Sequence, residues 1–173
     1  GGEATRVSET AAFWADPVWA PDGAAIVALR APMGSARTVP LPVPPDAVLV
    51  RVAVSGGQVT ELGPAGGARH PHFGREADRV YLASPEGLSS IRLDGADRKV
   101  EARYGKAAPG AAGLPPARDV RISPDGLRVV MAVDDRLYRL PLPAVRTPDI
   151  PTLDAPAGTG GGALVTDEGF AGF

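Results

Sequence analysis

The two histidines of the chain, His70 and His72, are separated by a single proline and are the residues best suited to metal chemistry. Alternate residues of a strand point to one face of a sheet, so this spacing can present two imidazoles to one ion. A complete site needs more ligands, and the chain has no third histidine and no cysteine. We therefore expect a structural or channel-lining role for both histidines and predict no metal-binding residue.

Aspartates in turn-like segments form the second group with metal chemistry. Carboxylates bind calcium, but none of these residues follows the Asp-x-Asp-x-Asp-Gly spacing of a calcium loop. Aspartate is also favoured in turns, because its side chain accepts a hydrogen bond from the backbone two residues on. We assign to turns Asp22, Asp94, Asp97, Asp125, Asp134 and Asp135.

The remaining signals for catalysis or cofactor binding are weak. The glycine-rich run at 158–162 lacks the Gly-Lys-Ser/Thr ending of a phosphate-binding loop and is interpreted as a linker. No Gly-x-Ser-x-Gly elbow is present. The sequence thus predicts no catalytic residue, no cofactor-binding residue and no cofactor.

The elements that position these side chains are predicted from a sequence motif that the chain repeats. Asp16-Pro17-Val18-Trp19-Ala20-Pro21-Asp22-Gly23 precedes a run of Ala, Ile, Val and Leu, and residues 119–132 have the same order. A degenerate copy of the motif, without Pro-Asp-Gly, lies at 70–83. The last residues, 170–173, resemble the beginning of another copy. Pro, Asp and Gly in this order predict a type I turn followed by a glycine with positive φ. Each copy is therefore expected to form a hairpin.

The large apolar residue before each turn gives the length of the repeat. Trp19, Phe73, Ile122 and Phe173 follow one another at intervals of 54, 49 and 51 residues. Repeats of this length built from short strands are typical of β-propeller blades, so these four residues are predicted to lie in the core between blades.

We predict an all-β fold: a β-propeller fragment of about three four-stranded antiparallel blades plus the start of a fourth. The blades are expected at about 16–62, 70–104 and 118–165, with 166–173 beginning a further blade. Three segments are predicted to lie outside the strands, namely a Pro-rich loop at 31–46, a connector at 105–117 and a Pro/Gly-rich insertion at 141–162. Thr5 to Val7 is predicted to be the last strand of a preceding blade.

Composition limits the class of protein. With 44% hydrophobic and 22% charged residues, the 173-residue chain is not expected to be disordered. A net charge of −2 without a basic cluster argues against nucleic acid as a partner. No apolar run approaches the roughly 20 residues of a membrane span. A start at glycine and an end inside a repeat suggest a piece of a longer protein.

The repeated motif, at residues 16–23 and again at 120–126, resembles the Trp-Ser-Pro-Asp-Gly repeat of the TolB-like β-propellers. More narrowly, Pro71-His72-Phe73-Gly74, Val80-Tyr81-Leu82 and residues 87–99 look like the propeller half of secreted bacterial amidohydrolases of the propeller-plus-barrel type. The resemblance implies that the metal ligands and the catalytic aspartate lie in a separate barrel domain. No motif of that barrel is present here, so no catalytic residue is carried over.

These observations predict a non-catalytic propeller segment that acts as scaffold, access gate or interaction surface for a hydrolase domain in a longer parent protein, itself a metal-dependent amidohydrolase. The alternative is a stand-alone TolB-like propeller that binds proteins in the periplasm. Expected partners are the remaining blades, the hydrolase domain and a protein ligand, in a periplasmic or secreted location. Because three blades leave open faces, we expect the isolated chain to be an oligomer that completes the ring or a fragment prone to aggregation.

Overall fold

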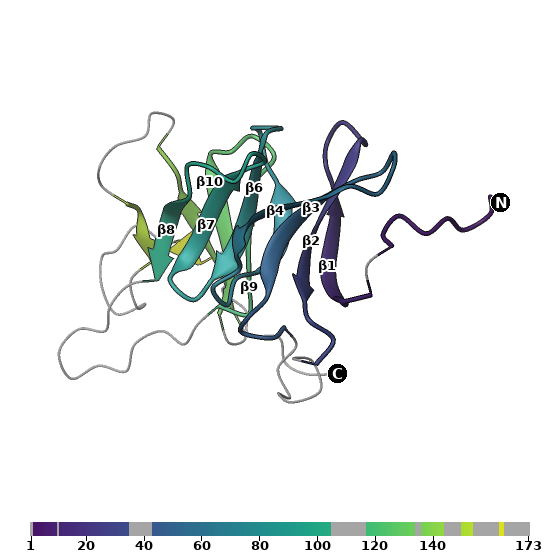
Figure 1. Cartoon of the computed structure of the whole chain (residues 1–173). Helices are drawn as coiled ribbons and strands as arrows, with labels where there is room; N and C mark the ends of the chain where they lie inside the picture. The colour runs from purple at the N-terminus through teal and green to yellow at the C-terminus, as the bar shows by residue number, and fades with distance from the viewer. Residues whose placement is uncertain are drawn as a thin grey trace, which may run out of the picture.

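A computed structural model describes residues 2–9, 11–34, 43–104, 117–133, 136–143, 150–153 and 163–164. These residues form strands, turns and irregular segments, and none of them is helical. The strands build three sheets that stand side by side (Figure 1). Among the described residues, no helix is long and apolar enough to cross a membrane. The predicted fold class is confirmed.

The first sheet contains four antiparallel strands in sequence order. The turn between its first two strands is the one predicted from Pro-Asp-Gly, because Gly23 donates its N–H to Ala20 at 2.9 Å and has a φ of 68°. Five of the seven residues of the second strand are buried, including Val27, Ala28 and Leu29 in succession, which explains its run of apolar residues. The strands are β1 (Phe13–Trp19), β2 (Ala25–Ala31), β3 (Val48–Ala53) and β4 (Val59–Pro64).

The second sheet has five strands, in the order β12-β8-β7-β6-β5. Four are antiparallel and follow one another in the chain, whereas β12 comes from the Pro/Gly-rich insertion and pairs in parallel with β8. This outer strand was not predicted, because two residues carry no periodic pattern. The strands are β5 (Arg69–Phe73), β6 (Arg79–Ser84), β7 (Gly87–Arg92), β8 (Lys99–Tyr104) and β12 (Thr152–Leu153).

The third sheet has the order β13-β11-β10-β9, again antiparallel. Its first turn repeats that of the first sheet, since Gly126 donates to Ser123 at 2.9 Å with a φ of 73°. The outer strand β13 follows the Pro/Gly-rich insertion and lies within the predicted bounds of the third blade, 118–165. The strands are β9 (Asp119–Ile122), β10 (Arg128–Val133), β11 (Arg136–Pro141) and β13 (Ala163–Leu164).

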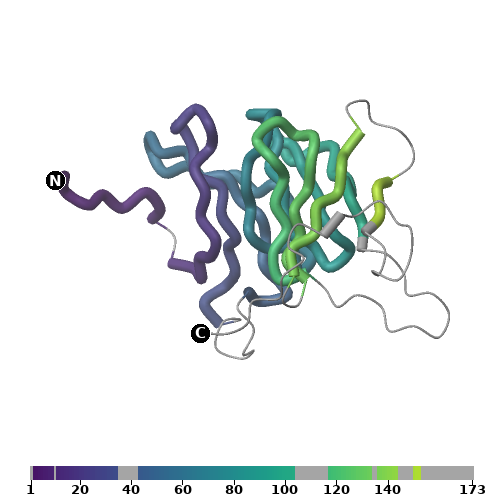
Figure 2. The backbone as a smooth tube through the Cα atoms, turned by 180° about the vertical axis from the view of Figure 1, so that it is seen from behind, coloured from purple at the N-terminus to yellow at the C-terminus, as the bar shows by residue number. Residues whose placement is uncertain are grey.

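The sheets stack face to face through two apolar cores, and we call them blades one, two and three. The core between blades one and two contains Val27, Leu29, Leu49, Val80 and Leu82. The core between blades two and three contains Tyr81, Leu88, Val120, Val129 and Met131. The first strand of each blade contacts the first strand of the next blade, β1 with β5 and β5 with β9. The view from behind shows the same order of blades (Figure 2).

One prediction about the core is wrong. Trp19 is exposed, whereas Ile122 is buried and Phe73 is partly buried, as predicted. The residue at this position of the repeat packs against the preceding blade, and the described part of the chain has no blade on that side of blade one. Phe173 lies outside the described residues.

The prediction of a strand from Thr5 to Val7 is also wrong. Residues 2–9 form no strand, but this segment lies against blade one, where a Cβ on Gly57 would lie 2.7 Å from the carbonyl oxygen of Val7. Together with Ile26, Ala28 and Val52, residues 5–8 line a hollow of about 570 Å³. The segment thus covers part of the face on which a preceding blade would pack.

Several predicted segments cannot be compared in full. The part of the Pro-rich loop at 35–42, the connector at 105–116 and the beginning of a further blade at 166–173 lie outside the described residues. Asp134 and Asp135 do so as well. The predicted loop at 31–46 begins one residue too early, because Ala31 is the last residue of β2.

Candidate functional site

His72 joins blade two to blade three. Its Nε2 accepts a hydrogen bond from the backbone N–H of Ile122 at 3.0 Å, and its Nδ1 lies 2.9 Å from the carbonyl oxygen of His70. An acceptor at Nε2 and a donor at Nδ1 define a neutral ring with its proton on Nδ1. Burial lowers the pKa of His72 below its ordinary value, against the smaller raising effect of the His70 carbonyl. The ring is therefore held in its neutral form by the blade junction.

His70 lies at the junction of blades one and two. Its backbone N–H donates to Oδ2 of Asp16 at 2.9 Å, and its Nδ1 lies 3.7 Å from the same oxygen. Asp16 and His70 occupy the same position in their repeats, each has a φ near 50°, and each lies at a β-bulge before a proline. The bulges turn these side chains toward the neighbouring blade. The two histidines thus contact different junctions.

Arg79 is the most buried charged side chain among the described residues, with 3% of its side chain exposed. Its guanidinium donates to Oε2 of Glu76 at 3.3 Å, to Oγ of Ser90 at 2.8 Å and to the carboxylate of Asp97. Burial alone would lower the pKa of Arg79, but the hydrogen bond and charge of Asp97 and the charge of Glu76 raise it above its ordinary value. The guanidinium is therefore a fixed cation at the start of β6.

Through these bonds Arg79 orients two glutamates, Glu76 between β5 and β6 and Glu101 on β8. Glu76 is held directly, and its Oε1 lies 3.5 Å from the hydroxyl of Tyr81. Glu101 is held indirectly, because Ser90 accepts from Arg79 and donates to Glu101 at 2.5 Å. The hydrogen bond from Lys99, followed by that from Arg79, lowers the pKa of Asp97. The result is a network of alternating charges at one end of blade two.

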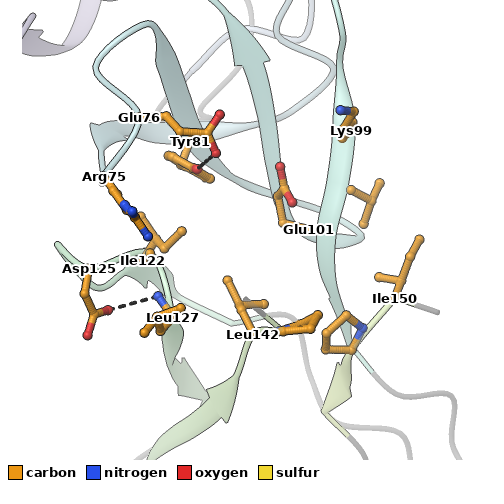
Figure 3. A pocket seen from close by; sticks show the side chains of 14 residues that line it. Arg75, Glu76, Tyr81, Lys99, Glu101, Ile122, Asp125, Leu127, Leu142 and Ile150 are labelled. Carbon is orange, nitrogen blue, oxygen red and sulfur yellow. Dashed lines mark hydrogen bonds between the residues drawn. The ribbon is translucent and has the colours of Figure 1, made fainter. Parts of the chain in front are cut away.

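The two glutamates open onto a cavity of about 430 Å³ between blades two and three (Figure 3). Charged groups of both signs, Arg75, Lys99 and Asp125 among them, also line it. The opposite wall is apolar and consists of Ile122, Leu127, Leu142, Ile150 and Pro151. A polar wall facing an apolar one suits a ligand or a partner side chain with one charged end.

The turn aspartates behave as predicted in three of the described cases. Asp22, Asp94 and Asp125 each accept a hydrogen bond of 2.9 Å from the backbone N–H two residues on. The prediction is wrong for Asp97, because its carboxylate binds Arg79 and Lys99 and the residue lies outside any turn. Nothing in the local sequence distinguishes it from a turn aspartate.

Sequence reasoning missed the charged network completely. Arg79 begins a strand with the same spacing as Arg128 in blade three, yet Arg128 is exposed and pairs only with the turn aspartate Asp125 among the described contacts. The burial of Arg79 depends on Asp97, 18 residues later, and on Ser90 in the next strand. A local pattern does not contain such a contact.

The chain is similar in fold to solved structures of low sequence identity. An oligogalacturonate lyase in complex with manganese aligns over 80% of this chain and 42% of its own, with a TM-score of 0.58 and 16% identity. A Lactobacillus plantarum protein aligns over 90% of this chain and 41% of its own, with a TM-score of 0.46 and 15% identity. At such identities the likeness to the lyase shows a propeller-type fold and nothing about activity. The chain spans about two fifths of the length of these structures.

No protein-family model matches the chain, and no curated protein matches it in sequence.

Proposed function

We propose that the chain is the propeller segment of a longer, secreted or periplasmic protein, in which it serves as scaffold, access gate or interaction surface for an amidohydrolase-like hydrolase domain. The observation that carries the proposal is the exposure of Trp19. The equivalent residues Phe73 and Ile122 pack against a preceding blade. An exposed tryptophan at the same position indicates a surface made to pack against more β-structure.

The combination of contacts at the blade junctions supports a scaffold role. Each junction combines an apolar core with a hydrogen bond between first strands, from His70 to Asp16 and from Ile122 to His72. A scaffold of this kind holds its loops at constant distances. The TolB-like repeat and the amidohydrolase-like sequence of blade two support the choice of a hydrolase as neighbour.

The parent gene tests the proposal most directly. Further blades followed by a barrel with a His-x-His strand are expected, and a stop codon directly after Phe173 would count strongly against a longer parent. In the parent protein, hydrolase activity on small substrates is expected to survive removal of residues 1–173, whereas selectivity for substrate size is expected to change. Unchanged selectivity would contradict a gating role.

The alternative is a stand-alone TolB-like propeller that binds a protein in the periplasm. The cavity between blades two and three favours it, because this chain alone forms a pocket with charged and apolar walls. Capture of a periplasmic partner is expected to fail with Arg75→Glu in the lining of the pocket and to persist with Arg92→Glu, an exposed arginine outside the cavity lining. Equal capture by both variants would remove the pocket from this alternative.

A further inference from the structure

The cavity between blades two and three combines three kinds of lining (Figure 3). Glu76 and Glu101 supply carboxylates, and Arg75 supplies a guanidinium. Ile122 and Leu142 belong to the apolar wall. The volume of about 430 Å³ lies within the range of sites for small ligands. The lining comes from blades two and three and from the segment that leads into β12, not from the open faces at the ends of the stack.

Buried groups fix the two carboxylates before any ligand arrives. Glu76 accepts from Nε of Arg79 at 3.3 Å. Glu101 accepts from the hydroxyl of Ser90, which in turn accepts from Arg79 at 2.8 Å. A carboxylate has lone pairs for about four hydrogen bonds, so each glutamate can bind an ammonium group in addition to the bonds that it already makes. Because Arg79 and Ser90 are buried, little side-chain entropy is left to lose on binding.

Arg75 differs from the other charged groups of the lining, because it makes no ion pair within the described part of the chain. The residue is exposed, and its stem lies against the turn of blade three, where a Cβ on Gly126 would lie 3.3 Å from the Cβ of Arg75. Lys99, by contrast, has its Nζ 2.7 Å from the carboxylate of Asp97. Arg75 is therefore the cation available to a carboxylate of a ligand, which a guanidinium binds through two parallel hydrogen bonds.

We propose that this cavity binds a zwitterion with an apolar side chain, either a free α-amino acid or a short peptide. The ammonium group of the ligand binds Glu76 and Glu101, its carboxylate binds Arg75, and its side chain packs on the apolar wall. A ligand with one charge is less favourable, since a cation meets the guanidinium and an anion meets the glutamates. The proposal goes beyond the proposed function, because it needs neither a hydrolase domain nor a protein partner.

Titration of the isotope-labelled 173-residue chain with matched probes, followed by nuclear magnetic resonance, tests the choice of ligand. Phenylalanine carries both charges, 2-phenylethylamine lacks the carboxylate and 3-phenylpropionate lacks the ammonium group. Phenylalanine or phenylalanylglycine is expected to bind at least about tenfold more tightly than either singly charged probe, the loss that one charge-assisted hydrogen bond produces. The tighter of the two zwitterions distinguishes a free amino acid from a peptide as ligand. Equal affinity for all probes would overturn the proposal.

Two substitutions test which residue binds which end of the ligand. Arg75→Gln is expected to weaken binding of the tighter zwitterion about tenfold and not to weaken binding of 2-phenylethylamine, which has no carboxylate. Glu101→Gln is expected to weaken binding of 2-phenylethylamine and not to weaken binding of 3-phenylpropionate. Arg92→Gln is the control, since Arg92 is exposed and lies outside the lining, and it should change the affinity of no probe. A loss that is the same for every probe would contradict the assigned contacts.

Thermal unfolding shows whether each variant is folded. If Glu101→Gln unfolds the chain, Glu76→Gln takes its place, because Glu76 is exposed. No binding of either zwitterion, or zwitterion binding that is indifferent to Arg75→Gln, would overturn the proposal and leave the proposed function standing. A parent gene without a hydrolase domain would remove the proposed function and leave the binding site standing.

Discussion

Nε2 of His72 in blade two accepts a hydrogen bond from the backbone N–H of Ile122 in blade three, at 3.0 Å. Ile122 is also the apolar residue that packs on Tyr81 in the core of this junction. One residue of blade three is therefore held to blade two by its backbone and its side chain together. The junction depends on a histidine that can accept this bond only when Nε2 carries no proton.

Stability is expected to fall in mildly acidic solution. Burial lowers the pKa of His72 in the folded chain, so the unfolded chain takes up a proton first. The stability due to neutral His72 is complete above about pH 6.5 and is lost as the pH falls from there toward the lower folded-state pKa. Urea unfolding measured between pH 8 and 5 is expected to show this loss. A free energy of unfolding that stays constant over this range would contradict it.

Replacement of His72 by phenylalanine is expected to lower the free energy of unfolding by about 1–3 kcal/mol, because the buried N–H of Ile122 loses its acceptor. His72→Gln supplies a carbonyl oxygen near Nε2 and should cost less. Both variants should lose the acid sensitivity, whereas His70→Asn should keep it. Equal stability of the phenylalanine and glutamine variants would show that the hydrogen bond contributes nothing.

Arg79→Met is expected to destabilise the chain by about 1–3 kcal/mol, because the buried hydroxyl of Ser90 and the backbone carbonyl of Asp97 lose the donor that they share. Arg92, the register partner of Arg79 on β7, is the matched control. Its bond to Asp78 is exposed, so Arg92→Met should cost about 0–1 kcal/mol. Chemical unfolding of both variants gives the comparison, and similar losses would show that burial of the network is unimportant.

Gly87→Ala is expected to destabilise blade two severely. Gly87 has a φ of 141°, and a Cβ there would lie 2.0 Å from the carbonyl oxygen of Ala102. Backbone must move to admit the methyl group, at a cost of about 3 kcal/mol or more from overpacking and strain. Gly56→Ala is the control, since φ is 84° but no atom lies within 4 Å, and it should cost about 1–2 kcal/mol. Thermal unfolding distinguishes the two variants.

The repeat itself was predictable from the sequence. Pro-Asp-Gly at 21–23 and 124–126 determines its turn through local backbone preferences, and the continuous apolar run after each turn predicts the second strand of the hairpin. Local chemistry of this kind also assigned Asp22, Asp94 and Asp125 to turns, where each accepts the predicted backbone bond. These features need no information beyond a few neighbouring residues.

Contacts between blades were decided by the tertiary structure alone. Trp19 and Ile122 occupy the same position of the repeat, yet one is exposed and the other buried, because burial depends on whether a blade lies behind the residue. Arg79 and Arg128 differ because of contacts within one blade, since only Arg79 meets Ser90 and Asp97, 11 and 18 residues later in blade two. Equivalent residues recur at nearly constant spacing along the chain, but the environment of each blade depends on the blades beside it. The residues that form this environment lie about 50 residues away in the sequence.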